Sequence, residues 1–300
     1  MLRSNIVGTL LALATLAPGE SHASDAWEPI EAPLVTLLDP GEEPRRALRY
    51  GMADATWTVA RRHRYDASIK LPLRGKQGDT GVISLDFRVR PVAPSGDEPV
   101  EIAVQLLDAI GRQGQVESLA GATGLVRYTD RGLPVAARWD AHAVDADAAA
   151  LADRMLLDRF RTRASHLPTP LPEESVGAGA RWEIRQTLVQ GASSFTMIAI
   201  CTLVEDRGEG LDLQCRFSHD AEATTFSVGN AARRQNVEIL ESDVRGQSLV
   251  LQPLHVPVPV REDGSLTTFF KAKTRIGIAR VKVDVTSEES WSQVVRGEAE

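Results

Sequence analysis

The sequence predicts a mainly β (α+β) fold in which a large curved antiparallel sheet, or half-barrel, wraps one long helix. Two observations support this prediction. Runs of alternating apolar and polar residues, the pattern of half-buried strands, recur along most of the chain. One segment, 145–165, instead has the spacing of an amphipathic helix. Because turn residues rather than helices join the strand-like runs, we expect antiparallel pairing.

Several strands are predicted before the helix. The clearest is 83–90, where four apolar residues alternate with Ser, Asp and Arg. A second alternating run covers 100–106. Segments 124–128 and 134–139 flank the turn residues 130–132, which predicts a hairpin. After the helix, the sharpest alternation is that of Ala279, Val281, Val283 and Val285 with polar neighbours.

The predicted helix 145–165 ends in positive charge and is followed by a proline-rich segment. Arg159, Arg161 and Arg163 lie near its C-terminus, where the helix dipole favours cations. The prolines of 168–172 cannot continue it. One helical face collects residues suited to packing on a sheet: Ala149, Leu156, Leu157, Phe160 and Ala164.

Two cysteines, Cys201 and Cys215, lie in alternating apolar runs on either side of the turn-forming segment 205–210. A hairpin centred on Gly208 makes the two cysteines cross-strand neighbours on the apolar face, within disulfide reach. We therefore expect a disulfide; the alternative is a pair of buried free thiols, which behave as small apolar side chains.

Residues 1–23 have the pattern of a secretory signal peptide. Arg3 provides a positive start, 6–17 is mostly apolar, and small residues precede a cleavage site near Ala23. The apolar run is too short to span a bilayer, which takes roughly 20 residues. We therefore expect a periplasmic or secreted protein, with no transmembrane segment in the mature chain.

The remaining chain is expected to form one main domain. Residues 24–44 are rich in Glu, Pro and Asp and predict a flexible N-terminal arm, which Trp27 could pin to the body. Residues 45–300 are expected to form a single antiparallel β domain, with a possible subdivision at 168–172.

Charge and motifs exclude several classes of function. The formal net charge of −7 argues against nucleic acid as a partner. HExxH, paired CxxC and GxSxG motifs are absent, so we expect no catalytic residue, no metal and no cofactor. The glycines of 176–180 predict a tight turn rather than a nucleotide loop, because a strand follows them. Asp140, Asp145 and Asp147 lack the spacing of a calcium loop.

A basic stretch, 61–64, lies in this otherwise acidic chain. One interpretation is a surface that meets anionic groups. The alternative is a solvated strand face whose arginines pair with nearby acids.

Two passages carry a resemblance to known proteins. Residues 171–182 follow the pattern P-x-x-x-V-G-x-G-x-x-W and, with the hairpin 202–213, resemble uncharacterised secreted bacterial proteins of a domain-of-unknown-function family. That resemblance implies a β-rich exported protein and no particular activity. The predicted architecture is also similar to the half-barrel of periplasmic lipoprotein carriers, an analogy at the level of fold alone.

Three functions remain open. The first is a non-enzymatic exported envelope protein that binds an apolar ligand or lipidated partner. The helix has a second, smaller apolar flank beside the face described above, and the candidate ligand-binding residues come from this flank and from apolar positions of the sheet: Leu151, Met155, Phe195, Met197 and Phe217. The second is an envelope scaffold or interaction protein without a ligand. The third is a hydrolase whose active-site residues are dispersed along the sequence.

Overall fold

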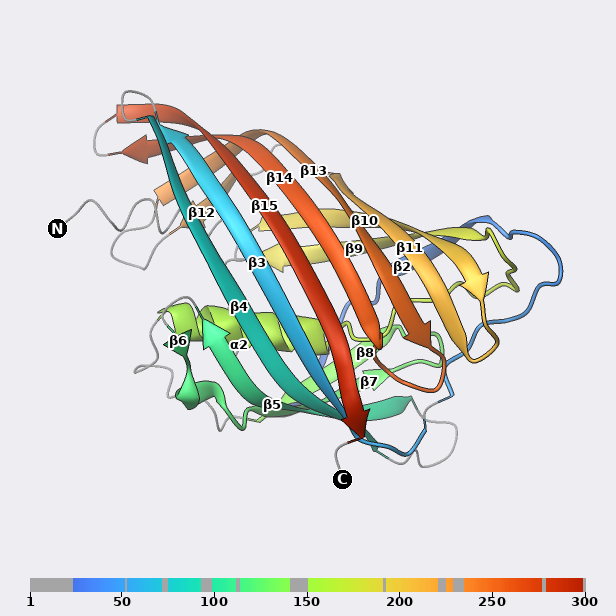
Figure 1. The fold of residues 1–300 in the computed structure, drawn as a ribbon. Coiled ribbons are helices and arrows are strands. Elements are labelled where there is room, and N and C mark those ends of the chain that lie inside the picture. Colours follow the sequence, from blue (N-terminus) through green and yellow to red (C-terminus); the bar gives the residue numbers. More distant parts are fainter. Residues whose placement is uncertain are drawn as a thin grey trace.

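The computed structural model describes most of the chain (Figure 1). The described residues are 24–51, 53–71, 75–92, 99–111, 114–140, 151–190, 193–220, 225–228, 235–276 and 279–298. The predicted signal peptide 1–23 and the first part of the predicted helix, 145–150, lie outside them.

Strands account for most of the described chain, as predicted. The elements before the helix are β1 (Ser24–Pro29), β2 (Leu34–Asp39), β3 (Trp57–Leu71), β4 (Gly75–Val92), β5 (Val100–Gly111), β6 (Gly114–Gln115), the 3-10 turn η1 (Glu117–Leu119), β7 (Thr123–Tyr128) and β8 (Pro134–Trp139). The helix α2 (Leu151–Ala164) and the later strands follow: β9 (Arg181–Gln190), β10 (Ser193–Asp206), β11 (Gly210–Asp220), β12 (Thr225–Val228), β13 (Gln235–Pro253), β14 (Arg261–Ile276) and β15 (Ala279–Glu298).

All of these strands belong to one antiparallel sheet, in the order β1-β8-β7-β5-β4-β3-β15-β14-β13-β11-β10-β9-β2, with β12 paired to β13 and β6 to β5. The sheet is open, since β1 and β2 form its two edges. These edge strands are separated in sequence only by residues 30–33. An extended link of that length reaches about 18 Å at most, so the sheet curls until its edges come near each other. Figure 1 shows this curvature in the long strands β3, β14 and β15.

The helix α2 covers the described part of the predicted helix 145–165. α2 has 14 residues, and the picture of a sheet wrapping one long helix is not supported. The helix packs on one side of the sheet's inner face, against β5 and η1. Leu156, Leu157, Phe160 and Ala164 of its predicted apolar face are buried, and the Phe160 ring meets Phe87 and Trp139 edge-on. The hydroxyl of Tyr128 donates to the carbonyl of Ala164 and satisfies one of the last carbonyls of the helix.

Residues 24–44, predicted to be a flexible arm, contribute the two edge strands. β1 pairs with β8 and β2 with β9. The ring of Trp27 lies 3.9 Å from the guanidinium carbon of Arg127 and 5.3 Å from that of Arg138. These cation–π contacts attach β1 to the β7–β8 hairpin.

Cys201 and Cys215 form the predicted disulfide. They face each other in the β10–β11 hairpin, and Gly208 takes the left-handed conformation at its turn, with φ of +81°. The disulfide belongs to an apolar cluster with Trp182, Leu203 and Leu213. A second apolar cluster lies under α2, around Phe87, Phe160 and Trp139.

The glycines of 176–180 form a tight turn that leads into β9. A side chain at Gly177 would collide with the carbonyl oxygen of Glu42, and the amide of Glu42 donates to the carbonyl of Ala178 at 2.8 Å. These residues therefore serve the packing of the segment that follows β2. Among the described residues, no helix has the length and apolar character needed to cross a membrane.

Candidate functional site

The inner face of the sheet is organised in rows, because strand register places residues of neighbouring strands side by side. Three successive rows cross the middle of the sheet, from β4 through β3, β15, β14 and β13 to β11. The Glu262 row contains Leu85, Arg61, Gln293, Glu262, Val250 and Leu213. The His63 row contains Ile83, His63, Trp291, Gly264, Ser248, Cys215 and, on β10, Cys201. The third row, which continues onto β10 and which we call the inner belt, contains Gly81, Tyr65, Glu289, Leu266, Gly246, Phe217 and Ala199.

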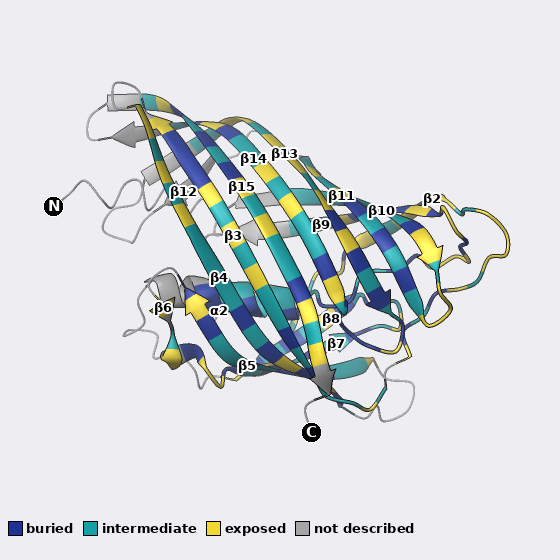
Figure 2. Ribbon diagram, viewed as in Figure 1, coloured by how far each residue is buried: buried dark blue, intermediate teal, exposed yellow. Residues whose placement is uncertain are grey.

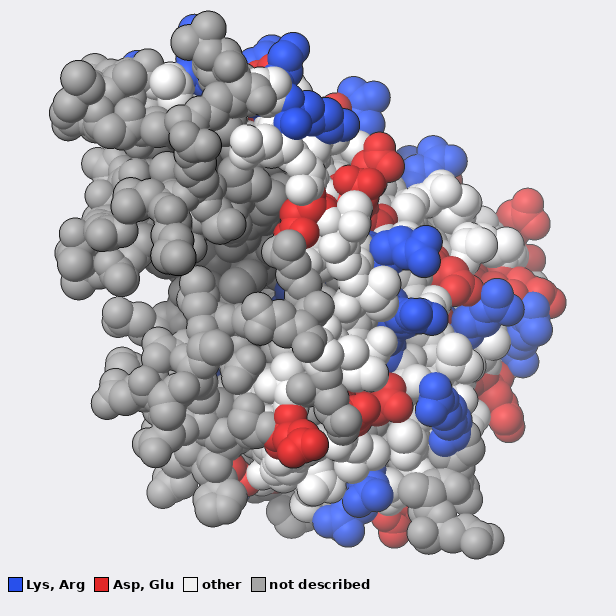
Figure 3. Space-filling model, turned by 60° about the vertical axis from the view of Figure 1, so that its left-hand side comes forward, with Lys and Arg blue, Asp and Glu red and all other residues white. Residues whose placement is uncertain are grey.

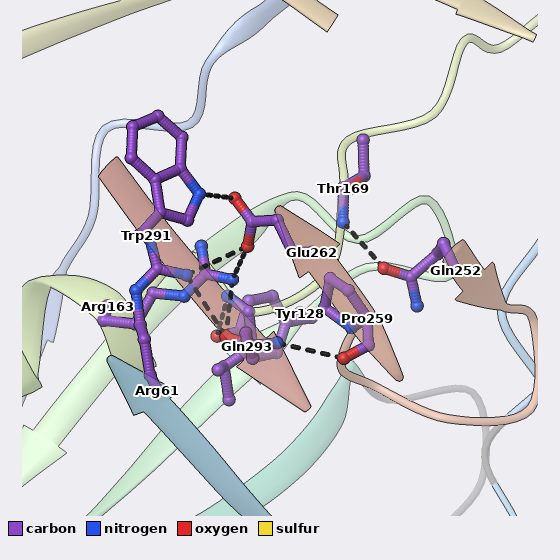
Figure 4. A network of polar contacts seen from close by, with 10 residues as sticks. Arg61, Tyr128, Arg163, Thr169, Gln252, Pro259, Glu262, Trp291 and Gln293 are labelled. Carbon is purple, nitrogen blue, oxygen red and sulfur yellow. Dashed lines mark hydrogen bonds and ion pairs between the residues drawn. The ribbon is translucent and has the colours of Figure 1, made fainter. Parts of the chain in front are cut away.

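A buried carboxylate in the Glu262 row binds two arginines from different elements (Figure 4). Nη1 of Arg61 on β3 lies 2.9 Å from Oε2 of Glu262, and Nη2 of Arg163 on α2 lies 2.5 Å from the same oxygen. Both guanidiniums also donate to Oε1 of Gln293, at 3.3 and 3.0 Å. Gln293 in turn donates to the carbonyl of Pro259 at 3.0 Å. This cluster joins the helix to the sheet through charged hydrogen bonds.

Charge and burial together shift the pKa values of this cluster. Burial alone would raise the pKa of Glu262, but the guanidiniums of Arg163 and Arg61 outweigh burial and hold that pKa at about 2. Burial and the neighbouring charge of Arg163 lower the pKa of Arg61 to about 10. Glu262 and Arg61 are therefore both charged at neutral pH.

Trp291, which lies in the His63 row, also binds the carboxylate of Glu262. Its indole Nε1 donates to Oε1 of Glu262 at 2.7 Å. The same ring packs against Phe217 of the inner belt, with ring centroids 6.1 Å apart. Trp291 thus joins the buried carboxylate to the apolar part of the inner face.

A second series of polar contacts begins at Arg159, one helical turn from Arg163, and ends at Glu289 of the inner belt. Nη1 of Arg159 lies 3.1 Å from Nδ1 of His63, and Nε2 of His63 lies 2.8 Å from Oε2 of Glu289. Arginine can only donate, so Nδ1 accepts and the Nε2–H of His63 donates to Glu289. Both ring nitrogens are occupied. In this arrangement His63 has no free nitrogen with which to take a proton from a nucleophile.

The inner belt differs from the rows beside it in its burial. Each of its residues from Gly81 to Ala199 is partly exposed. The His63 row is partly exposed only from Ile83 to Gly264 and is buried from Ser248 onward, and Arg61 is the one partly exposed residue of the Glu262 row. Figure 2 shows the alternation of burial along the same strands. The belt is therefore a strip of partly uncovered apolar and aromatic groups beside a charged cluster.

The residues predicted to bind a ligand are described only in part. Phe217 lies in the inner belt, and Met197 lies two residues before Ala199 on the same face of β10; both are partly exposed. The side chains of Leu151, Met155 and Phe195 lie outside the described residues.

The basic stretch 61–64 does not form one surface, because alternation in β3 divides it. Arg61 and His63 point to the inner face and bind acids there, whereas Arg62 and Arg64 are exposed on the outer face. On the described part of the surface in Figure 3, basic and acidic side chains are intermingled. The alternative interpretation, pairing with nearby acids, holds for the two inward residues, but these are mostly buried rather than fully solvated.

Sequence reasoning missed the charged cluster, although a signal for it was present. The alternation of Val281, Val283 and Val285 continues in phase to Glu289, Trp291 and Gln293. Polar residues in the apolar phase of a long strand indicate an inward polar site. Among the described residues, no group of three or more His, Cys, Asp or Glu side chains could hold a metal ion.

Comparison with known proteins finds no matching family model and no matching curated sequence.

Proposed function

We propose that this chain is an exported, non-enzymatic protein of a bacterial envelope that binds an apolar ligand, or the acyl chain of a lipidated partner, along the inner belt. The observation that carries the proposal is the partial exposure of inward-facing apolar groups, namely Phe217, Leu266 and Ala199 of the belt and Met197 beside it. Apolar side chains on a concave inner face normally gain stability from full burial. A bound apolar chain would supply the missing contacts.

Export rests on the signal-peptide pattern of residues 1–23 and is supported by the disulfide. Disulfides persist in oxidising compartments such as the periplasm or the extracellular space. A curved open sheet with an apolar inner strip also suits a carrier, which has to admit and release its cargo.

The first test is native mass spectrometry of the protein purified without detergent from the cells that make it. We expect a mass above that of the chain, with the excess extracted by organic solvent. A bare mass, together with no uptake of an apolar fluorescent probe, would overturn the proposal and favour a scaffold without ligand.

Paired variants locate the site. Ala199→Trp would fill the inner belt and should reduce probe uptake at least about tenfold, which corresponds to 1.4 kcal/mol. Arg216→Trp adds the same ring to the exposed outer face of β11 and should leave uptake unchanged. Equal effects of the two substitutions would contradict binding at the belt.

A further inference from the structure

The helix α2 places two arginines beside the inner belt. Arg159 and Arg163 are one turn apart and share a flank of the helix. Arg163 reaches the Glu262 row, and Arg159 reaches His63, whose other nitrogen binds Glu289 of the belt. Cationic groups from the helix therefore lie at the boundary of the apolar strip.

The charges of this cluster do not balance. The two glutamates, Glu262 and Glu289, face three guanidiniums, those of Arg61, Arg159 and Arg163, while Arg159 donates to an unprotonated nitrogen of His63. Among the groups of this cluster that the structure describes, one positive charge is left over. An uncompensated charge inside a protein is costly, and a bound anion would offset that cost.

The excess charge is located at Arg159. Arg159 forms no direct ion pair with a described residue: it donates to the ring of His63, and its nearest opposite charge is that of Glu289, which His63 already binds. Burial lowers the pKa of the Arg159 guanidinium. In addition, the buried Nε of Arg163 has no hydrogen-bond partner among the described residues. The side chains of Arg61 and Arg163 remain 16% and 20% exposed, so the cluster is not sealed.

We propose that the ligand is an amphiphile with an anionic oxygen headgroup, held by Arg159 and Arg163, whose hydrocarbon chain lies along the inner belt. This inference rests on the proposed function and adds the chemistry of the headgroup. Guanidiniums suit carboxylate and phosphate oxygens, because their N–H groups form charge-assisted, bidentate hydrogen bonds.

The test compares three ligands with the same twelve-carbon chain: dodecanoate, dodecyl phosphate and dodecanol. Lipid is first removed from the full-length protein on a hydrophobic resin, and affinities are measured at pH 8 by displacement of an apolar fluorescent probe. Hydrogen bonds in which a partner is ionised are roughly twice as strong as neutral ones, so at least one anionic ligand should bind about tenfold or more tightly than the alcohol. The better of the two anions identifies the headgroup as carboxylate or phosphate.

Variants assign the preference to the helix. Arg159→Gln should remove most of the preference for the anion and leave the affinity for dodecanol unchanged, whereas Arg159→Lys should keep part of the preference. Arg62→Gln, which removes an exposed arginine from the outer face of the same sheet, is the matched control and should change nothing.

Two outcomes separate the two proposals. If the alcohol binds as tightly as the anions, or if Arg159→Gln keeps the preference, the headgroup inference fails and the apolar site stands. If neither the probe nor any of the three ligands binds, both proposals fail. The comparison of ligands on the unmodified protein decides the headgroup even where a variant does not fold.

Discussion

The indole ring of Trp291 lies directly over Gly264 on the neighbouring strand. A Cβ atom built at Gly264 would collide with the ring. The missing side chain lets the indole lie flat across β14 and reach Glu262 with its N–H, at 2.7 Å. The Tyr65 ring covers Gly81 on β4 in the same way. Aromatic rings over cross-strand glycines thus shape the inner face and position the donor for the buried carboxylate.

Replacing Gly264 by alanine should therefore destabilise the protein by about 1–3 kcal/mol, the usual cost of overpacking. The added methyl group would displace the indole and weaken its bond to Glu262. Urea unfolding followed by circular dichroism measures the change. The control is Gly78→Ala on β4, where the nearest atom to an added Cβ would lie 3.6 Å away. Similar losses at the two positions would contradict the role given to Gly264.

Glu262 should make the stability of the fold sensitive to acid. Its pKa is about 2 in the folded protein against an ordinary value of 4.5, so the unfolded chain takes up the proton first as pH falls. The stabilisation is complete above about pH 5 and is lost as the pH falls towards 2. A shift of this size corresponds to about 3 kcal/mol.

The variant Glu262→Gln tests that dependence. It should lower the free energy of unfolding at pH 7 by about 3 kcal/mol, because Arg61 and Arg163 lose their counter-charge. It should also flatten the fall in stability between pH 5 and 2. Glu288→Gln, on the exposed outer face of β15, should do neither. An unchanged acid slope in Glu262→Gln would show that other carboxylates control acid unfolding.

Much of the fold could be predicted because alternation records which side of a strand is buried. The runs at Leu85, Phe87 and Val89 and at Val283 and Val285 are buried as expected, and the cysteine register is correct. Residues 24–44 were harder, since short edge strands rich in Pro and Glu carry little alternation. Their pairing depends on contacts distant in sequence, such as those of Trp27 with Arg127 and Arg138.

The charged cluster could not be assembled from sequence because its members come from four separate elements. Arg61, Arg163, Glu262 and Gln293 lie on β3, α2, β14 and β15, and only the register of the sheet brings them together. The three helix arginines also had a sufficient local explanation in the helix dipole. That explanation did not reveal that Arg159 and Arg163 face the sheet interior.

Trp27 should stabilise the edge of the sheet locally and have little effect on the strands at its centre. Trp27→Ala removes the ring that Arg127 and Arg138 contact, and each such contact at an exposed site contributes roughly 0.5–1 kcal/mol. Hydrogen exchange should accelerate in β1 and β8, while β14 and β15 stay protected. Trp27→Phe keeps an aromatic face and should restore most of the protection. Faster exchange throughout the sheet would contradict a local role.

The disulfide should stabilise the protein without taking part in binding. Cys201 and Cys215 are 14 residues apart, and in the chain-entropy model closing a loop of this size contributes about 3 kcal/mol. The double variant Cys201→Ser and Cys215→Ser should therefore unfold at lower urea concentration, and reductant should lower the melting temperature of the original protein but not of the variant.

Both cysteines lie in the buried part of the His63 row, beside Trp182 and away from Arg159. Probe uptake at low temperature should consequently match that of the unmodified protein. A melting temperature indifferent to reductant would exclude the disulfide, and a loss of uptake in the still-folded variant would place the cysteines in the binding site.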